Sequence, residues 1–380
     1  MTQTIGVIGA GQLAQMMAIA SQSLDINLIV QADRADDVAI PYADHAIIGK
    51  ERSHFQQLAQ SCNCITFEHE FIDLNLLEQV FREFTPEFLP SLPVMAILVD
   101  KLHQRELLHQ QGIAVPQFVA VDDLSSLEAA GHRLGFPCVI KARRNGYDGK
   151  GTWVVHDATE LNQAWQRMGA VPCLVEAHIP YIKELALIAG KSRDGKQVIY
   201  PVVETIQKQQ VCQRVVAPAP VSDTIAQQAI AIAQQILHSL DSASLLGIEF
   251  FLTAENLVLV NEIAPRTHNS GHYTIDACNV SQFEQLLRIT ADLPVIMPQM
   301  TVPYAVMLNL LGYENRDYDY AQERSHIANL PSTHLHWYHK TSARIGRKLG
   351  HATVVGNHLD QVLATAESVH QLWYQPCFNP

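Results

Sequence analysis

The chain lacks an excess of positive charge and any long apolar run, and each absence excludes a class of protein. Its 380 residues carry 26 Lys and Arg against 38 Asp and Glu, a net charge of −12. Because nucleic-acid phosphates select basic surfaces, this balance argues against a nucleic-acid partner. The opening stretch "MTQTIGVIGAGQLAQMMAIASQS" has no basic leader, and Gly and Gln interrupt it before membrane-spanning length. We therefore expect a cytoplasmic protein with no membrane partner.

Zinc and redox motifs are also missing. The seven cysteines include no C-x-x-C pair, which is typical of a reducing compartment. His268 and His272 have an i, i+4 spacing but lack the glutamate of H-E-x-x-H. His334 and His336 share one face of a predicted strand, yet "HLHWYH" brings neither a carboxylate nor a cysteine to them. The sequence therefore predicts no zinc site, and packing or substrate contact for these histidines.

The beginning of the chain indicates an α/β fold. "TIGVIGAGQLAQMMAIASQSLDINLIVQAD" alternates a strand, a glycine turn, a helix and a second strand, which is a βαβ pattern. It contains G-x-G-x-x-A at Gly9, Gly11 and Ala14, with Asp33 in the place of a ribose-binding acid. This dinucleotide fingerprint is weak, because a turn that only lets helix and strand pack closely explains it equally well. The length exceeds that of one hydrophobic core, so several domains are expected.

The middle of the chain continues to alternate. After the prolines of "FLPSLPVM", the pattern predicts a helix over 100–111. "FPCVIKAR" and "GTWVVHD" are predicted strands, "CLVEAHI" and "ELALIAGKS" are expected to continue their sheet, and a helix is predicted over 223–240. "LLGIEFFLTAENLVLVNEIAPR" predicts a hairpin, and beyond about residue 298 we expect alternating short strands and turns.

The stretch "RRNGYDGKGTW" at 143–153 joins two of these predicted strands and concentrates glycine and positive charge. A glycine-rich hairpin tip exposes backbone N–H groups and approaches oxygens that a Cβ would exclude. It is not a Walker A loop, because G-x-x-x-x-G-K-[ST] is absent. Lys141 and Lys150 add two cations beside these amides. The stretch therefore predicts a lid over nucleotide phosphates.

The predicted hairpin brings two carboxylates together. A two-residue turn at Glu255 and Asn256 places Glu249 opposite Glu262. The same turn pairs Phe250 with Asn261 and Phe251 with Val260. Directly opposed like charges destabilise a sheet unless a cation neutralises them. Mg²⁺ held by carboxylates and nucleotide phosphates is the usual solution. "NEIAPR" adds a neutral oxygen ligand, Asn261, and a guanidinium that matches phosphate.

These motifs, in this order, resemble the ATP-grasp superfamily. Within it, "IGAGQLAQM", "TFEHE", "GYDGKGTW", "NEIAPRTHNSGHYT" and "HLHWYHKTSARIGRKLGH" are similar to the carboxyaminoimidazole ribonucleotide synthetase family, over about residues 4–356. The resemblance implies a Rossmann-like N-terminal domain (1–98), an ATP-grasp domain (99–297, with subdomains at about 115–180 and 181–297) and a small β-rich C-terminal domain (298–380). It also implies a homodimer.

The implied reaction uses ATP to phosphorylate bicarbonate, and the amine of aminoimidazole ribonucleotide then captures the released CO₂ as a carbamate. By resemblance, Glu249 and Glu262 hold two Mg²⁺ ions and Glu184 binds the ribose hydroxyls. Residues 176–179 border the adenine. The implied nucleotide site is Lys101, Lys141, Gly146, Tyr147, Asp148, Gly149, Lys150, Gly151, Thr152, Glu176, Ala177, His178, Ile179, Glu184, Gln207, Asn261 and Glu262.

Chemistry and acceptor binding are assigned by the same resemblance. Arg266 stabilises the transferring phosphoryl group, and Tyr147, Lys150 and Lys348 lie near bicarbonate or its product. The implied acceptor site is Gly11, Gln12, Glu68, Glu70, His268, Asn269, Ser270, Arg347 and Lys348. Three alternatives stay open: a related ligase that uses formate or another acyl group, an NAD-dependent oxidoreductase, and a silent homologue that binds nucleotide without turnover. The oxidoreductase leaves the 249/262 pair unexplained.

Overall fold

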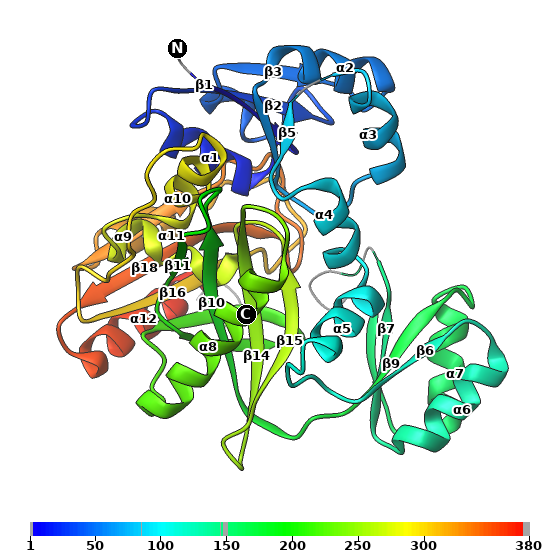
Figure 1. Ribbon diagram of the computed structural model, residues 1–380. Coiled ribbons are helices and arrows are strands. Elements are labelled where there is room, and N and C mark those ends of the chain that lie inside the picture. The colour runs from blue at the N-terminus through cyan, green and yellow to red at the C-terminus, as the bar shows by residue number, and fades with distance from the viewer. Residues whose placement is uncertain (1–2, 85, 145, 147–150, 375–380) are drawn as a thin grey trace.

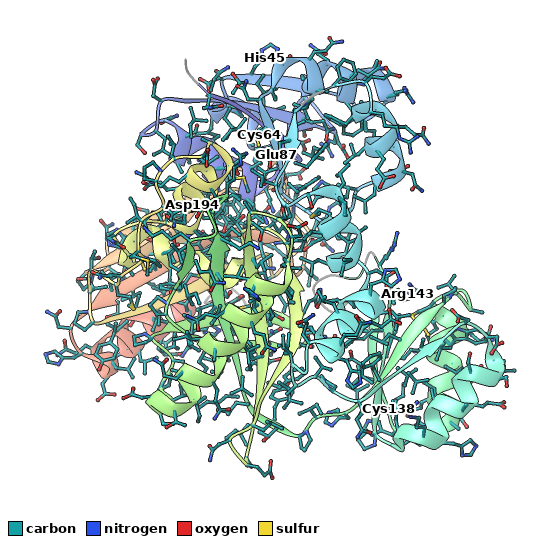
Figure 2. The ribbon with its side chains drawn as sticks, in the orientation of Figure 1. His45, Cys64, Glu87, Cys138, Arg143 and Asp194 are labelled. Atoms are coloured by element: carbon teal, nitrogen blue, oxygen red, sulfur yellow. The ribbon has the colours of Figure 1, made fainter. Side chains whose placement is uncertain are left out.

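The computed structural model describes residues 3–84, 86–144, 146 and 151–374. Three sheets and their helices form the molecule, and its mixed helix and strand content confirms the expected α/β class (Figure 1). No helix in the described ranges is long and apolar enough to cross a membrane. The cysteines in these ranges are free, and Cys64 and Cys138 lie in different domains (Figure 2).

The N-terminal domain is a five-stranded parallel sheet in the order β3-β2-β1-β4-β5, which confirms the predicted βαβ beginning. Its strands are largely buried, as expected for a parallel sheet covered on both faces. Its elements are β1 (Gln3–Ile8), α1 (Gln12–Ser21), β2 (Ile26–Ala32), a 3-10 turn η1 (Ile40–Tyr42), β3 (His45–Ile48), α2 (Arg52–Ser61), β4 (Cys64–Phe67), α3 (Leu74–Phe81) and β5 (Glu87–Phe88).

Helices α4 (Leu92–Leu98) and α5 (Lys101–Gln110) lead to a four-stranded antiparallel sheet in the order β6-β9-β7-β8 (Figure 1). Helix α5 confirms the prediction over 100–111, and Asp100 caps it. This smaller lobe contains β6 (Phe118–Val121), α6 (Leu124–Leu134), β7 (Cys138–Ala142), β8 (Thr152–Val155), α7 (Ala158–Arg167) and β9 (Cys173–Ala177). Its apolar cluster consists of its own residues, so the lobe packs as a separate unit.

The third sheet has nine strands in the path β15-β14-β10-β12-β13-β16-β18-β17, with β11 paired to β10. Helices α8, α10 and α12 pack against it through apolar clusters. Its strands are β10 (Tyr181–Lys191), β11 (Gln197–Ile199), β12 (Val203–Lys208), β13 (Val211–Ala217), β14 (Ser244–Thr253), β15 (Val258–Ala264), β16 (Tyr304–Leu311), β17 (Thr333–Trp337) and β18 (Lys348–Gly356). Between and after them lie α8 (Asp223–Ser239), η2 (Asn269–Gly271), α9 (Thr274–Ala277), α10 (Gln282–Thr290), α11 (Ala321–Ala328) and α12 (Leu359–Tyr374).

Two sequence predictions about these sheets are wrong. The strands of "CLVEAHI" and "ELALIAGKS" do not continue one sheet, because β9 belongs to the smaller lobe and β10 to the nine-stranded sheet. The region beyond 298 is not only short strands and turns. It adds three strands to the large sheet and contains α12, whose Val362, Ala366, Val369 and Trp373 are buried against them. That i, i+4, i+7, i+11 spacing is a helical pattern.

The N-terminal domain and the nine-stranded sheet share one apolar core. The cluster runs from β1, α1 and β2 to β10, β14 and α10. At its edge the Arg193 guanidinium donates to Cys64 Sγ at 3.1 Å and pairs with Glu87 at 2.9 Å. Figure 2 shows Cys64 and Glu87 at this junction. The two bodies are therefore fixed to each other by buried apolar contact as well as by polar contacts.

Candidate active site

A cavity of about 920 Å³ lies where the three sheets meet. Most of the sequence-predicted site residues line it: Gly11, Gln12, Glu68, Glu70, Lys101, Lys141, Gly146, Thr152, Glu176, Ala177, His178, Ile179, Glu184, Gln207, Glu249, Asn261, Glu262, Arg266, His268, Asn269 and Lys348. Tyr147, Asp148, Gly149 and Lys150, and with them the predicted lid, lie outside the described residues. Gly151, Ser270 and Arg347 are described but do not line the cavity.

The hairpin of β14 and β15 confirms that Glu249 pairs with Glu262, although the predicted register is wrong nearer the turn. The turn holds three residues, 254–256, with the Thr253 N–H donating to the Leu257 carbonyl at 3.0 Å. Phe250 therefore pairs with Val260 instead of Asn261. A β-bulge between Glu249 and Phe250 then restores the register. Bulges re-aim side chains beside active sites, and this one brings Asn261 and Glu262 to the cavity together.

The two opposed carboxylates differ in their electrostatic surroundings. Burial, with the nearby charges of Glu262 and Glu184, raises the pKa of Glu249 to about 7. Burial also opposes ionisation of Glu262, but Lys101, whose Nζ lies 2.7 Å from Glu262 Oε1, lowers the pKa of that carboxyl. The Asn261 amide donates to Glu249 Oε2 at 3.4 Å, and His268 Nε2 lies 3.5 Å from Glu249 Oε1. A divalent cation beside Glu249 would offset the repulsion from the neighbouring carboxylates and so lower the pKa of Glu249.

A buried ion network joins the smaller lobe to this hairpin. Arg105 on α5 donates to Glu176 Oε1 on β9 and to the Asn261 carbonyl on β15. Lys141 on β7 reaches Glu176 Oε2 at 2.7 Å and Asn261 Oδ1 at 3.3 Å. Although burial opposes ionisation of Glu176, Arg105 and Lys141 lower its pKa to about 2. The Glu176 carboxylate is thus shared by two cations at the wall of the cavity.

The arginines that open the glycine stretch are also engaged. Asp100, which is 2% exposed, pairs with Arg143 at 2.8 Å and with Arg144 at 3.1 Å. Asp100 caps α5 through the Leu102 N–H at the same time. The Arg143 carbonyl accepts from the Lys101 N–H at 2.8 Å. These contacts fix the first strand of the glycine hairpin to the helix that carries Lys101 and Arg105.

The far end of the cavity has an aromatic wall that the sequence did not reveal. Tyr181 on β10 and Phe251 on β14 stack with ring centroids 4.7 Å apart and planes 11° apart, and both line the cavity. Glu184 lies next to them, and burial raises the pKa of its carboxyl to about 7. Apolar rings beside one hydrogen-bonding carboxylate suit a nucleoside.

At the opposite end of the cavity, the Glu68 carboxylate lies at the start of α1, where a substrate anion was expected. The carboxylate accepts from the backbone N–H of Gly11 and, at 3.1 Å, from that of Leu13, and so caps α1. A Cβ on Gly11 would lie 2.4 Å from Glu68 Oε1. The close approach that these glycines permit is therefore to Glu68, so the Gly11 amide is not available to a phosphate.

Glu70 ties the N-terminal domain to the hairpin side. Both of its carboxylate oxygens lie 3.0 Å from the Arg266 Nη2. Arg266 also donates to the Thr267 carbonyl at 2.8 Å. The guanidinium is thus held over the cavity by a partner from another domain, in a position to contact an anion there.

Comparison with known proteins agrees with this architecture. Family models match the ribonucleotide synthetase preATP-grasp domain at residues 1–97, the ATP-grasp domain at 106–283 and the phosphoribosylaminoimidazole carboxylase C-terminal domain at 305–365. The N5-carboxyaminoimidazole ribonucleotide synthase of Synechococcus elongatus is 45% identical over 354 residues, covering 93% of this chain and 89% of that protein. The chain belongs to the N5-carboxyaminoimidazole ribonucleotide synthase family.

A solved structure of the same family shows that the fold is shared along the chain. The Aspergillus clavatus N5-carboxyaminoimidazole synthase, in complex with ADP and 5-aminoimidazole ribonucleotide, is 30% identical with a TM-score of 0.91. The match covers 98% of this chain and 99% of that one. The ATP-grasp fold expected from the sequence is thereby confirmed.

Within this family fold, the 267–272 loop is built differently from the sequence expectation. Ser270 is buried, and its hydroxyl lies 2.9 Å from His268 Nδ1, so its predicted contact with substrate is wrong. The Asn269 and Asn309 amides donate to each other at 2.9 and 2.6 Å. Gln282, fully buried, accepts from the His268 N–H and donates to the His268 carbonyl. Gln282 was not predicted, because helix α10 reaches the loop only in the folded chain.

The two cations of the "GRKLGH" segment, Arg347 and Lys348, have different surroundings. Lys348 lines the cavity, and its charge acts on both Glu249 and His272. Arg347 instead donates to the Ser342 carbonyl at 2.7 Å and to the Ser342 hydroxyl at 3.0 Å. Arg347 lies just before β18, and its contacts with Ser342 hold the guanidinium there. Arg347 therefore does not reach the cavity, contrary to its assignment to the acceptor site.

Proposed function

We propose that the chain catalyses the ATP- and bicarbonate-dependent carboxylation of 5-aminoimidazole ribonucleotide to N5-carboxyaminoimidazole ribonucleotide, a step of purine biosynthesis in the cytoplasm. The observation that carries this proposal is the Glu249 and Glu262 pair, with Asn261 and Lys101 beside it. The pair lies in the cavity between the rings of Tyr181 and Phe251 and the polar groups around Glu68. Relatives named for this activity, and a relative solved with ADP and the acceptor, support it.

The nucleotide is assigned to the half of the cavity nearer the smaller lobe. The rings of Tyr181 and Phe251 and the backbone of 177–179 would contain the base, and Glu184 would accept from the ribose hydroxyls. Lys101 and Lys141 would face the phosphates. Thr152 on β8 and Gln207 on β12 line the same cavity.

Two Mg²⁺ ions fit the donor set of Glu249, Glu262 and Asn261, because all three offer hard oxygen ligands and one carboxyl has a raised pKa. When bound, the ions would neutralise charge on the transferring phosphoryl group. Lys101 would move from Glu262 to the phosphates as the ions arrive. Arg266, held by Glu70, would face the charge that develops on the phosphoryl oxygens.

The proposed carboxylation has two steps. A bicarbonate oxygen attacks the γ-phosphorus of ATP, the bond to ADP breaks, and carboxyphosphate forms. Carboxyphosphate then releases CO₂ and phosphate, and the acceptor amine adds to CO₂ and loses a proton to give the carbamate. His268, Lys348 and Gln12 line the region where the acceptor would lie.

Phosphate release by the purified chain tests the activity. We expect release to require ATP, Mg²⁺ and bicarbonate together, to rise with aminoimidazole ribonucleotide, and to yield one carbamate per phosphate. Formate in place of bicarbonate should give no product. Formyl transfer to the acceptor, or nicotinamide reduction, would show one of the alternative functions instead. A homodimer belongs to the same proposal on the strength of the family resemblance, and sedimentation velocity measures it.

Lys348→Ala should weaken acceptor binding much more than ATP binding. A charge-assisted hydrogen bond to a phosphate or carboxylate contributes about 1.5–3 kcal/mol, so the KM for aminoimidazole ribonucleotide should rise by roughly 10- to 100-fold. The matched control is Lys340→Ala, a cation of the same domain that lies over the Tyr338 ring, outside the cavity. If ATP affinity collapsed in Lys348→Ala while the acceptor bound normally, the acceptor would have to be assigned elsewhere.

A further inference from the structure

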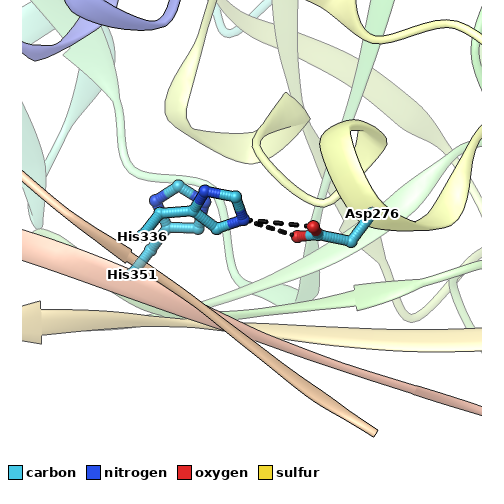
Figure 3. A group of neighbouring side chains, drawn as sticks. All are labelled: Asp276, His336 and His351. Carbon is cyan, nitrogen blue, oxygen red and sulfur yellow. Dashed lines mark hydrogen bonds and ion pairs between the residues drawn. The ribbon is translucent and has the colours of Figure 1, made fainter. Parts of the chain in front are cut away.

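Three histidines share one face of the sheet edge formed by β17 and β18. His336 pairs directly with His351 across the two strands, and His334 pairs with Thr353 two positions along. Side chains at alternate positions of a strand point to the same face. Helix α9 lies against β18 and carries Asp276 to the imidazoles (Figure 3). The sequence offered no carboxylate to these histidines because Asp276 lies 60 positions before His336.

The contacts within this group are close. His336 Nε2 lies 2.9 and 3.1 Å from the two Asp276 oxygens, and His334 Nδ1 lies 3.8 Å from Oδ1. The His336 and His351 rings stack with centroids 4.5 Å apart. One ligand atom from each of Asp276, His336 and His351 lies within 4.8 Å of the other two. A carboxylate and two imidazoles from three elements thus converge on one small volume.

His351 supplies a second observation that points to a ligand. The residue is fully buried, and its Nε2 has no hydrogen-bond partner among the described residues. Its Nδ1 lies 2.7 Å from the Tyr338 hydroxyl. With Nδ1–H donating to that oxygen, Nε2 carries a lone pair in the interior of the protein. This is the arrangement of a metal-binding histidine, whose other nitrogen donates to a fixed acceptor.

We propose that Asp276, His336 and His351 bind a divalent transition-metal ion of the Zn²⁺ class, with His334 as the fourth donor. Imidazole nitrogens select Zn²⁺ and its neighbours over Mg²⁺, which takes oxygen ligands. The site is therefore distinct in chemistry from the Glu249 and Glu262 pair. Stacked rings do not aim their lone pairs at one point, so binding requires His336 to rotate out of the stack and the ion to replace its hydrogen bond to Asp276.

Occupation of this site would act on the acceptor side of the cavity. The His272 ring lies 4.9 Å from that of His351 and lines the cavity. An ion held by Asp276 on one side and His336 and His351 on the other would join α9 to the strand that begins with Lys348. Binding the ion in the folded state alone would also raise the midpoint of thermal unfolding.

Cobalt binding to the full-length protein tests the site. The chain is stripped with a chelator, returned to excess MgCl₂ and titrated with Co²⁺, whose visible absorption reports nitrogen-rich, four-coordinate sites, and Zn²⁺ is then added as competitor. We expect one Co²⁺ per chain, displaced by one Zn²⁺. Asp276→Asn and His336→Gln should each weaken Co²⁺ binding at least about tenfold, and Tyr338→Phe by about tenfold.

Two controls separate this site from others. His326→Gln removes an exposed histidine of the same domain, and Glu249→Gln removes a predicted magnesium ligand. Both should keep the cobalt spectrum and its stoichiometry. Asp276 and His336 carry the test because neither is fully buried, and circular dichroism checks that their variants fold. The proposal is overturned if folded Asp276→Asn binds Co²⁺ like the unaltered chain, if the spectrum follows Glu249, or if the chain binds no Co²⁺.

Discussion

Glu249→Gln and Glu262→Gln should each lower the rate of phosphate release by at least about 100-fold, because each removes one of two carboxylates that would hold Mg²⁺ at the phosphates. Extra MgCl₂ should restore little of the rate, since glutamine is a poor ligand for a hard cation. The measurement is turnover as a function of Mg²⁺ concentration. Glu255→Gln, an exposed position in the turn of the same hairpin, is the matched control and should leave the rate unchanged.

Without metal, Glu249→Gln should raise the stability of the fold, although it lowers the rate of phosphate release. The pKa of Glu249 is about 7 in the fold against an ordinary value of 4.5, so the folded state binds more protons than the unfolded state between these values. Stability without metal therefore falls as pH rises from about 4.5 to 7, and the penalty persists above pH 7. Glu249→Gln removes this penalty, so its free energy of unfolding above pH 7 should exceed that of the unaltered chain by up to about 3 kcal/mol.

Urea denaturation in the presence of a chelator, at pH 5 and pH 8, measures this difference. A variant that was inactive and also less stable at pH 8 would show that Glu249 has a structural role. A variant that was stable and fully active would remove the shared-metal argument altogether. Loss of activity together with a gain in metal-free stability is the combination expected of a charged ligand pair.

The sequence allowed the Glu249 and Glu262 pair to be predicted because two departures of the hairpin from a regular two-residue turn cancel each other. The turn is one residue longer than assumed, and a bulge at Asn261 corrects the offset before Glu249 is reached. Alternation of apolar residues identifies a hairpin, but a bulge inserts one residue and leaves little trace in the pattern. The pairing of Phe250 and Phe251 was for this reason wrong while that of Glu249 was right.

Contacts between distant segments account for what the sequence did not show. Arg105 is i+4 from Lys101 on one helix face, but nothing local indicates that Glu176 and Asn261 lie against it. Glu68 follows β4, and its role as the cap of α1 depends on β1 and β4 being neighbours. Asp276 likewise meets His336 only after β17 has joined the edge of the large sheet. Such partners are decided by topology, which single-sequence periodicity does not determine.

The buried Glu176 gives the largest expected effect on stability. Its side chain is 2% exposed and is shared by Arg105 and Lys141, so Glu176→Gln leaves two cations in the interior without the carboxylate that both contact. Removing one partner of a buried ion pair costs about 3–5 kcal/mol, and we expect the free energy of unfolding at pH 7 to fall by that amount. Glu204→Gln is the control: its bond to Lys183 is also 2.7 Å, but both side chains are partly exposed, so the loss should stay below about 1 kcal/mol.

The pH dependence of this loss has a defined direction. The pKa of Glu176 is about 2 in the fold, below its ordinary 4.5, so the carboxylate stabilises the fold above pH 4.5 and that contribution disappears as pH falls toward 2. The difference between Glu176→Gln and the unaltered chain, measured by urea denaturation, should therefore shrink over this range. A difference that stayed constant down to pH 2 would mean that the variant loses packing and not charge.

Replacing the whole network separates its contribution to stability from its contribution to function. A triple variant with Glu176→Leu, Arg105→Met and Lys141→Met exchanges charged groups for apolar ones of similar length, and such exchanges are often neutral or stabilising. We expect it to recover most of the stability lost in Glu176→Gln while it no longer supports ATP-dependent phosphate release, because Lys141 is gone from the cavity. If the triple variant were as unstable as Glu176→Gln, the ions would be needed to join the smaller lobe to the hairpin, and not only to hold Lys141 at the phosphates.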